Sequence, residues 1–128
     1  MIVIVIVGIL SAVALPNFLS QSNKAKATEC TTKLGAILSQ GGAEGLADSA
    51  NAVSLATSIA STETTNSTYC TFGTPAVATG TTIMTVTVTG KGDLSGQYNA
   101  NGCINWTTMK RDIEYKVGTT AAATASCT

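Results

Sequence analysis

The sequence predicts an α+β fold, in which one long N-terminal helix packs on a small antiparallel β-sheet. Three observations lead to this prediction. Residues 1–15 are uncharged and almost entirely aliphatic, residues 17–40 carry apolar side chains at helical spacing, and residues 69–117 contain alternating runs rich in β-branched residues. The chain has 128 residues, which is room for one domain. We divide it into an apolar helix over residues 1–16 and a globular part over residues 17–128.

The first fifteen residues read MIVIVIVGILSAVAL, and only Gly8 and Ser11 interrupt the large aliphatic side chains before Ala12. Each large aliphatic side chain that becomes fully buried contributes about 1.5–3 kcal/mol, so this run is not expected to face water. A helix that spans a bilayer needs about 20 apolar residues, and the run alone is shorter than that. We therefore expect it to be buried in lipid or among copies of itself.

An amphipathic helix is predicted over residues 17–40, which contain no proline and no glycine before Gly35. Its apolar side chains recur mostly at three- and four-residue steps and form one stripe. They are Phe18, Ala25, Ala27, Cys30, Leu34, Ile37 and Leu38. This stripe is expected to pack on the rest of the chain, and Gly41-Gly42 is expected to end the helix.

Residues 41–68 are expected to form a connection, in which residues 45–61 could be either a short second helix or a surface loop. The sheet is expected over residues 69–117. Its predicted strands cover residues 83–89, 94–98, 103–108 and 109–117, with a turn at residues 90–93 and a loop at residues 99–102. The tail, residues 118–128, is rich in Ala and Thr and would be poorly ordered if Cys127 did not hold it.

Four widely spaced cysteines, Cys30, Cys70, Cys103 and Cys127, include no C-x-x-C pair and indicate two structural disulfides. Disulfides place this part of the chain in an oxidising compartment. Three pairings are possible. We prefer Cys30 with Cys70, which ties the helix to the first strand region, and Cys103 with Cys127, which pins the tail to the sheet. The nested pairing of Cys30 with Cys127 and Cys70 with Cys103 is the main alternative.

The composition argues against several classes of function. The chain has no histidine, which is the side chain most often used as a general base or zinc ligand near neutral pH. Seven basic and seven acidic residues cancel, and charged residues make up only 11% of the chain. No net field therefore favours nucleic acid. We expect no enzymatic activity, no metal site, no cofactor and no specific nucleic-acid site.

Two N-x-[ST] sequons occur, at Asn66 and Asn105. Between Thr62 and Thr68 the sequence also carries a cluster of hydroxyl residues that suits O-linked sugars. The candidate glycosylation positions are Asn66, Asn105, Thr64, Thr65 and Ser67.

The segment from Gly8 to Phe18, GILSAVALPNF, resembles the N-terminal signature of type IV pilins and of the related pseudopilins of type II secretion. A helix followed by an antiparallel sheet with a late disulfide is also similar to the overall plan of that family. Family members carry a short F-T-L-x-E-[LM] segment before this run, and its glutamate would lie two residues before Met1. That segment is absent here, so either native residues precede Met1 or this chain lacks the acid.

The resemblance implies a structural subunit of an extracellular filament, which is a homopolymer of the chain. Before assembly the subunit would sit in the bacterial inner membrane, where a prepilin peptidase and the pilus assembly machinery would act on it. Motility, adhesion and DNA uptake all remain open as the use of the filament. In the filament, the apolar helices of many copies would pack together through Ile2, Ile4, Ile6, Gly8, Ile9, Leu10, Val13 and Leu15.

Gly8 and Pro16 bracket a stretch in which the helix is weakened, because Pro16 removes a hydrogen-bond donor and Gly8 adds backbone freedom. In related filaments the helix melts in this region, so the resemblance implies that it does so here. A simple kink at Pro16 is the alternative.

Two other functions are weighed against the filament subunit. A pseudopilin or minor pilin of a secretion system would share the same N-terminal sequence. A secreted adhesion or binding module would lose its N-terminus as a signal peptide, because Ala12-Val13-Ala14 resembles an A-x-A cleavage site.

Overall fold

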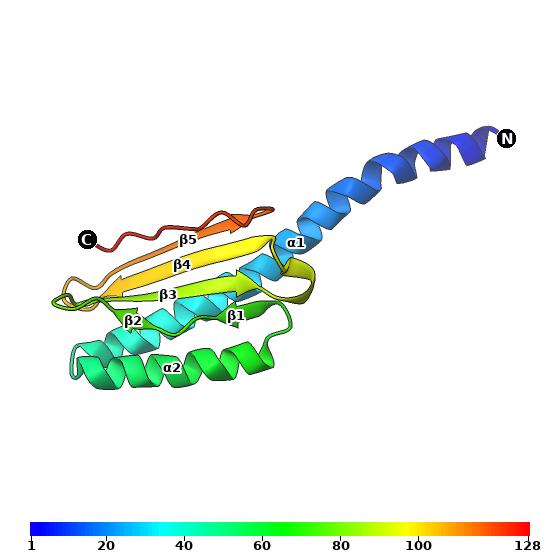
Figure 1. Ribbon diagram of the computed structural model, residues 1–128. Coiled ribbons are helices and arrows are strands. Elements are labelled where there is room, and N and C mark those ends of the chain that lie inside the picture. The colour runs from blue at the N-terminus through cyan, green and yellow to red at the C-terminus, as the bar shows by residue number, and fades with distance from the viewer.

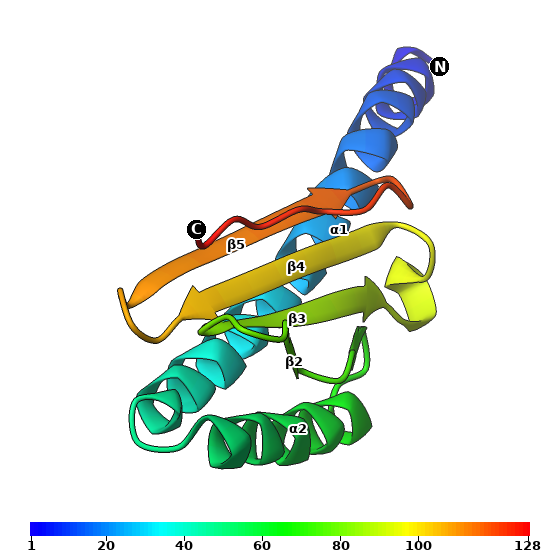
Figure 2. The same cartoon turned by 60° about the vertical axis from the view of Figure 1, so that its left-hand side comes forward.

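A computed structural model describes residues 1–128 and places two α-helices on one face of an antiparallel sheet (Figure 1, Figure 2). The helix α1 (Ile2–Gly45) is 44 residues long, and α2 (Ser49–Asn66) runs back beside it. The predicted α+β class is therefore confirmed. The strands are β1 (Cys70–Phe72), β2 (Ala76–Val77), β3 (Ile83–Gly90), β4 (Tyr98–Asn105) and β5 (Lys110–Val117), with a short 3-10 helix, η1 (Gly92–Leu94), between β3 and β4.

The sheet has the strand order β1-β3-β4-β5, and β2 pairs with β3 on the same side as β1. Every pair is antiparallel. In the register, Val86 of β3 lies beside Gly102 of β4, which lies beside Ile113 of β5. Met84, Val86 and Val88 are buried while the threonines between them are exposed, so the alternation predicted for residues 83–89 is confirmed.

The hydrophobic core fills the space between the two helices and this face of the sheet. The second half of α1 contributes most of the stripe predicted for it, and Leu34, Ile37 and Leu38 are fully buried. Ala52, Ala56 and Ala60 face α1 from α2 at four-residue spacing, and their small size lets the two helices approach closely. Asp48 caps α2, because its carboxylate accepts hydrogen bonds from the backbone N–H groups of Ala50 and Asn51.

The predicted end of α1 at Gly41-Gly42 is wrong, because α1 continues to Gly45. Of the two alternatives for residues 45–61, the second helix is confirmed, and α2 fills most of the predicted connection over residues 41–68. The glycines serve packing instead of ending the helix, since the absence of side chains at these positions makes room for the sheet. A Cβ atom at Gly41 would meet the side chain of Met84, and one at Gly42 would meet Ile104. These glycines therefore mark where α1 lies closest to the strands.

We predict opposite effects for alanine at two glycines of α1. A Cβ atom at Gly45 would lie 2.5 Å from Cε3 of the rigid Trp106 ring, whereas one at Gly35 would lie 3.7 Å from Cδ1 of Ile113. Gly45→Ala is expected to lower the free energy of unfolding by about 1–3 kcal/mol through overpacking. Gly35→Ala is expected to raise it by about 0.5–1 kcal/mol through helix propensity. Urea unfolding of both variants checks this pair, and a stabilised Gly45→Ala would contradict the packing argument.

Two strand predictions are also wrong. In the segment predicted as a strand over residues 94–98, the buried Leu94 ends η1, residues 95–97 form a turn, and Tyr98 begins β4. The predicted loop at residues 99–102 lies inside β4, which is continuous because it is hydrogen-bonded to β3 on one side and β5 on the other. Asn99 and Asn101 thereby project from the face of the sheet opposite the helices. The predicted strand over residues 103–108 ends at Asn105, whose side chain accepts hydrogen bonds from the backbone N–H groups of Thr107 and Thr108.

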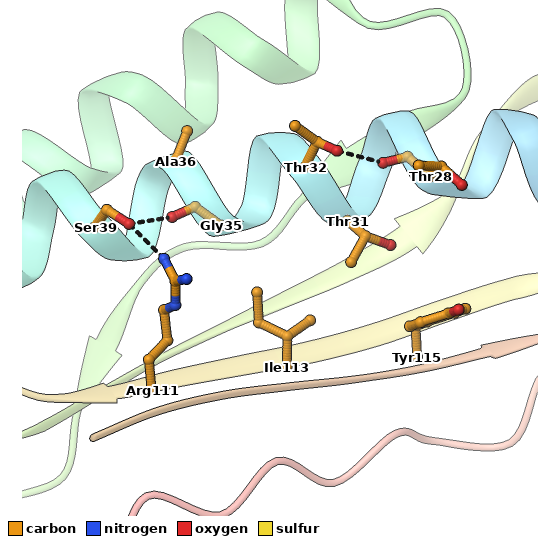
Figure 3. Close-up of a pocket in the computed structure, with 9 residues that line it drawn as sticks. All are labelled: Thr28, Thr31, Thr32, Gly35, Ala36, Ser39, Arg111, Ile113 and Tyr115. Atoms are coloured by element: carbon orange, nitrogen blue, oxygen red, sulfur yellow. Dashed lines mark hydrogen bonds between the residues drawn. The ribbon is translucent and has the colours of Figure 1, made fainter. Parts of the chain in front are cut away.

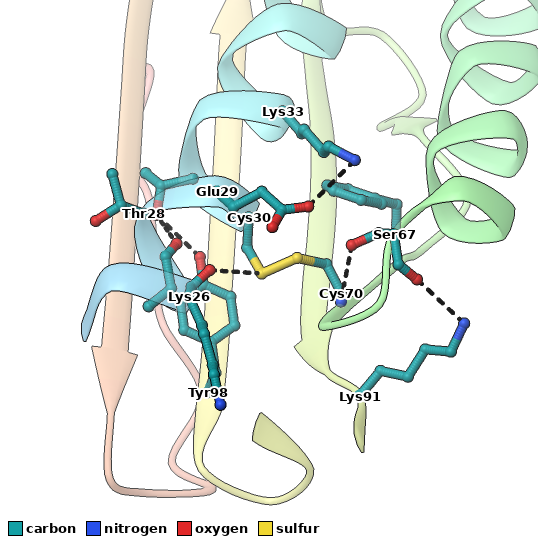
Figure 4. Close-up of a disulfide and its surroundings, with 12 residues drawn as sticks. Lys26, Thr28, Glu29, Cys30, Lys33, Ser67, Cys70, Lys91 and Tyr98 are labelled. Atoms are coloured by element: carbon teal, nitrogen blue, oxygen red, sulfur yellow. Dashed lines mark hydrogen bonds and ion pairs between the residues drawn. A yellow bond between two sulfur atoms is a disulfide. The ribbon is translucent and has the colours of Figure 1, made fainter. Parts of the chain in front are cut away.

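The disulfides join Cys30 to Cys70 and Cys103 to Cys127, which is the pairing preferred from the sequence. The first links α1 to β1 in the core (Figure 4). The second holds the C-terminal tail, which runs back along β5 without regular structure (Figure 1). Asp112 further anchors the tail, since its carboxylate accepts a hydrogen bond from the backbone N–H of Ser126 at 2.9 Å.

Lysines of α1 connect this helix to the elements beside it. Lys26 Nζ lies 2.7 Å from Asp93 Oδ2, and Lys33 Nζ lies 3.0 Å from Glu63 Oε2 of α2 and 3.3 Å from Glu29 Oε1. The hydrogen bond to Asp93 raises the pKa of Lys26, and the hydrogen bond to Glu63 raises the pKa of Lys33. Burial raises the pKa of Tyr98, whose hydroxyl lies 3.0 Å from that of Thr31.

These shifts predict that the protein loses stability in alkali. Lys26, Lys33 and Tyr98 each hold their proton more tightly in the folded state than in the unfolded chain. The three protonated groups therefore contribute their full stabilisation of the fold below the ordinary pKa values of 10.5 for lysine and 10.0 for tyrosine. This contribution is lost as the pH rises through the higher pKa values that the groups have in the folded state. The midpoint of thermal unfolding should stay level near neutrality and fall above about pH 10. A midpoint that is unchanged up to about pH 11 would contradict this assignment.

Candidate assembly surface

The first half of α1 projects away from the rest of the molecule (Figure 1). All residues from Met1 to Gln21 are exposed, although this stretch is dominated by large aliphatic side chains. Leu10, near its middle, is 65% exposed. We call residues 2–19 the arm. In the single chain, the arm is an apolar helix without a partner.

The sequence placed the end of the apolar segment at Pro16, but the exposed apolar surface runs one turn further. Phe18 is 72% exposed and Leu19 is 60% exposed, so Phe18 does not belong to the stripe that packs on the globular part. The first charged side chain is Lys24, and this is the signal in the sequence that marks the longer segment. At 1.5 Å per residue the arm is roughly 27 Å long, close to the hydrocarbon thickness of about 30 Å. By length and composition, α1 is the one helix that could cross a membrane.

The residues predicted to pack in a filament core all lie in the arm, and none of them packs within the single chain. The eight, exposed on all sides of the helix, are Ile2, Ile4, Ile6, Gly8, Ile9, Leu10, Val13 and Leu15. A Cβ atom at Gly8 would have no heavy atom within 4 Å, so nothing in the monomer requires a glycine there.

Pro16 lies inside α1, which remains helical on both sides of it. Ser11, between Gly8 and Pro16, donates its hydroxyl to the carbonyl of Val7 at 2.8 Å, as serine does within a regular helix. The single chain therefore holds the stretch from Gly8 to Pro16 as helix. Melting of this stretch in a filament stays a prediction.

A second surface feature is a groove of about 490 Å³ between the packed half of α1 and the edge strand β5 (Figure 3). α2 packs beside β1 and α1 packs over β3, β4 and β5, but α1 leaves the core-side face of β5 partly uncovered. Tyr115 on that face is 53% exposed. The residues that line the groove are Thr28, Thr31, Thr32, Gly35, Ala36, Ser39, Arg111, Ile113 and Tyr115.

The hydroxyls on the α1 wall of the groove are bonded within the protein. The hydroxyls of Thr28, Thr32 and Ser39 donate to carbonyls one turn earlier in α1, at 3.0, 2.9 and 2.8 Å. Arg111 is the one charged residue of the lining, and its Nη1 donates to Ser39 Oγ at 2.6 Å (Figure 3). These hydroxyls are therefore not free donors for a ligand in the groove. No sequence pattern indicates this groove, because it depends on how α1 and β5 are placed relative to each other.

The candidate glycosylation positions differ in exposure. Ser67 is only 3% exposed and its hydroxyl accepts from the backbone N–H of Cys70 (Figure 4), so a sugar does not fit there in the folded protein. The Thr64 hydroxyl is half-buried and bonded to the backbone of Phe72. Thr65 and Asn66 are exposed at the end of α2, and modification of these two positions stays a prediction.

Asn105, the second sequon, is engaged in the structure. Its Nδ2 donates to the carbonyl of Cys127 at 3.3 Å, and its Oδ1 accepts from the hydroxyl of Thr82 at 3.0 Å. A sugar attached to Nδ2 would displace the bond to Cys127 and with it one anchor of the tail. Asn105 therefore acts as a structural residue in this fold.

No group of three or more His, Cys, Asp or Glu side chains is arranged to hold a metal ion. Protein-family models, curated proteins and solved structures were compared with this chain, and none of them matches it. The class of protein therefore follows from the architecture alone. An exposed apolar N-terminal helix continues into a helix packed on an antiparallel sheet with two disulfides, and this architecture is pilin-like. The disulfides and the apolar helix indicate a secreted or membrane-associated protein.

Proposed function

We propose that the chain is the structural subunit of an extracellular type IV pilus-like filament and has no enzymatic activity. The observation that carries this proposal is the arm, which is a continuous exposed apolar helix in a chain whose other large apolar side chains are mostly buried in one core. Its exposed surface corresponds to an unfavourable free energy on the order of 20 kcal/mol in water. Such a surface needs either a membrane or other copies to cover it.

The two environments can replace each other at little cost. An apolar helix in lipid gains little hydrophobic free energy by moving into contact with other apolar helices, so van der Waals packing decides their association. The subunit would first sit in the inner membrane through the arm, with the disulfide-linked domain outside. The peptidase and the assembly machinery would then transfer it into a homopolymer in which arms contact arms.

Electron microscopy of material sheared from cells that produce the full chain tests the proposal. We expect filaments that bind an antibody against this chain, and mass spectrometry of those filaments should recover residues 1–19. A chain that stays in the membrane with its arm, without surface filaments, would instead fit a pseudopilin or minor pilin. A soluble monomer whose N-terminal residue is Leu15 would support the secreted module and overturn the filament.

A further inference from the structure

We propose that the groove between α1 and β5 binds the arm of a second copy of this chain. This inference rests on the proposed function and deepens it, because it names the surface of the globular domain against which a neighbouring arm packs. The helical layer that covers the sheet is incomplete. α2 and α1 lie side by side on the sheet (Figure 2), and the core-side face of β5 next to α1 is left partly uncovered as the groove.

The groove has the shape for a helix. Its α1 wall carries small side chains at helical spacing, and Thr28, Thr32, Ala36 and Ser39 are exposed along it. This wall covers about three turns, or roughly 16 Å of the axis of α1. Small side chains allow two helix axes to approach to about 8–10 Å. Ile113 and Tyr115 on β5 supply apolar contacts on the other wall.

The groove also has the chemistry for an apolar helix. A polar ligand needs unsatisfied donors or acceptors, but the hydroxyls of the α1 wall are already bonded to carbonyls of α1. An apolar side chain that covers them leaves none of these hydroxyl donors unpaired, so it avoids the penalty for burying an unsatisfied donor on this wall. Arg111 donates to Ser39 and can place the rest of its guanidinium at the rim.

The arm is the occupant that the molecule itself supplies. The other large exposed apolar side chains are scattered singly, at Leu46, Leu55, Met109 and Tyr115, whereas the arm is a continuous apolar helix. The arm of the same chain cannot reach the groove, because it continues the axis of α1 away from it (Figure 1). The occupant is therefore a second copy. With a length of roughly 27 Å, an arm can fill the groove and still extend beyond it.

Photo-crosslinking tests the contact directly. A benzophenone amino acid replaces Ala36 in the full chain, and isotope-labelled and unlabelled copies are mixed before assembly. The first tryptic cleavage site is Lys24, so the arm is released as one peptide, residues 1–24. We expect crosslinks between position 36 of one copy and residues 1–24 of another. The same probe at Ser54, which is exposed on α2, should not give this product.

A matched pair of charged variants tests the energetic role of the groove. Thr32 and Thr62 are both exposed helical threonines whose hydroxyls donate to the carbonyl one turn earlier at 2.9 Å, but only Thr32 lines the groove. Thr32→Lys should lower the ratio of assembled to free chain by about tenfold, because an apolar helix would bury the new charge. Thr62→Lys should leave this ratio unchanged, and circular dichroism should show both variants folded.

The outcomes separate this inference from the proposed function. Assemblies in which position 36 crosslinks elsewhere, or in which Thr32→Lys assembles like Thr62→Lys, would overturn docking in the groove and leave the filament subunit standing. A wild-type chain that forms no assemblies would overturn both. Crosslinks to residues 1–24 of a second copy support both.

Discussion

Replacing Cys30 and Cys70 together by alanine is expected to lower the free energy of unfolding by about 4 kcal/mol, because the disulfide restricts an unfolded chain over a separation of 40 residues. Both residues are fully buried and belong to the core, so the variant also loses packing between α1 and β1. A small domain has only about 5–15 kcal/mol of stability, and the thermal midpoint should fall by roughly 15–30 °C.

Cys103→Ala with Cys127→Ala is the matched control for this prediction. Its separation is 24 residues, for which the same chain-entropy argument gives about 3.5 kcal/mol. Here, however, the tail can detach while the sheet and the helices remain packed, because only Ala123 and Cys127 of the tail are buried. We expect a smaller loss of global stability and rapid proteolysis after Val117.

Both double variants are measured by urea unfolding in a mild detergent that covers the arm. If the Cys30–Cys70 variant unfolds at the same urea concentration as the wild type, the disulfide does not hold α1 to β1 in the way described. If its midpoint falls no further than that of the Cys103–Cys127 variant, the tail is a larger part of the cooperative unit than its contacts indicate.

The elements that could be predicted from the sequence are those whose pattern reports directly on their environment. The alternation through Met84, Val86 and Val88 defines a strand buried on one face, and it does so without reference to any other element. The unbroken aliphatic run of the arm likewise indicates a helix that cannot face water. The preferred disulfide pairing belongs to the same group, because it follows from placing a helix before a sheet and a tail after it.

The elements that could not be predicted depend on tertiary contacts. α2 is made largely of Ala, Ser and Thr, and its burial comes from Ala52, Ala56 and Ala60 against α1 rather than from large apolar side chains. The glycine pair in α1 looks like a helix stop until Met84 and Ile104 are seen to occupy the space beside it. Asn99 and Asn101 look like loop residues, but pairing on both sides of β4 keeps them in the sheet.

The candidate site divides in the same way. The arm could be predicted from the sequence, but its end could not be placed correctly at Pro16. The first charged residue, Lys24, is the better signal, because the exposed apolar surface continues past the proline. The groove could not be predicted, because its two walls lie more than seventy residues apart along the chain, as the contact between Ser39 and Arg111 at a separation of 72 shows. Only the register of β5 on β4, which places Ile113 beside Gly102, brings the second wall to α1.

A lysine in the middle of the arm is expected to prevent its insertion into a membrane. Leu10 lies near the centre of residues 2–19, and a charged side chain at the centre of a spanning helix costs about 2.5–3.5 kcal/mol. Leu10→Lys should therefore reduce the fraction of the full chain that floats with lipid vesicles by about a hundredfold. The globular domain should stay folded, because Leu10 contacts nothing in it.

Ile2→Lys provides the control, since it introduces the same charge at the end of the arm. There a lysine can extend its ammonium group to the interface, so binding to vesicles should fall by much less. Equal losses for the two variants would mean that the arm lies along the surface instead of crossing the bilayer. An unchanged Leu10→Lys would mean that the arm does not enter hydrocarbon, and burial among copies would then be its remaining role. Comparing a charge at the centre of the arm with one at its end thus shows whether lipid covers the arm before any filament forms.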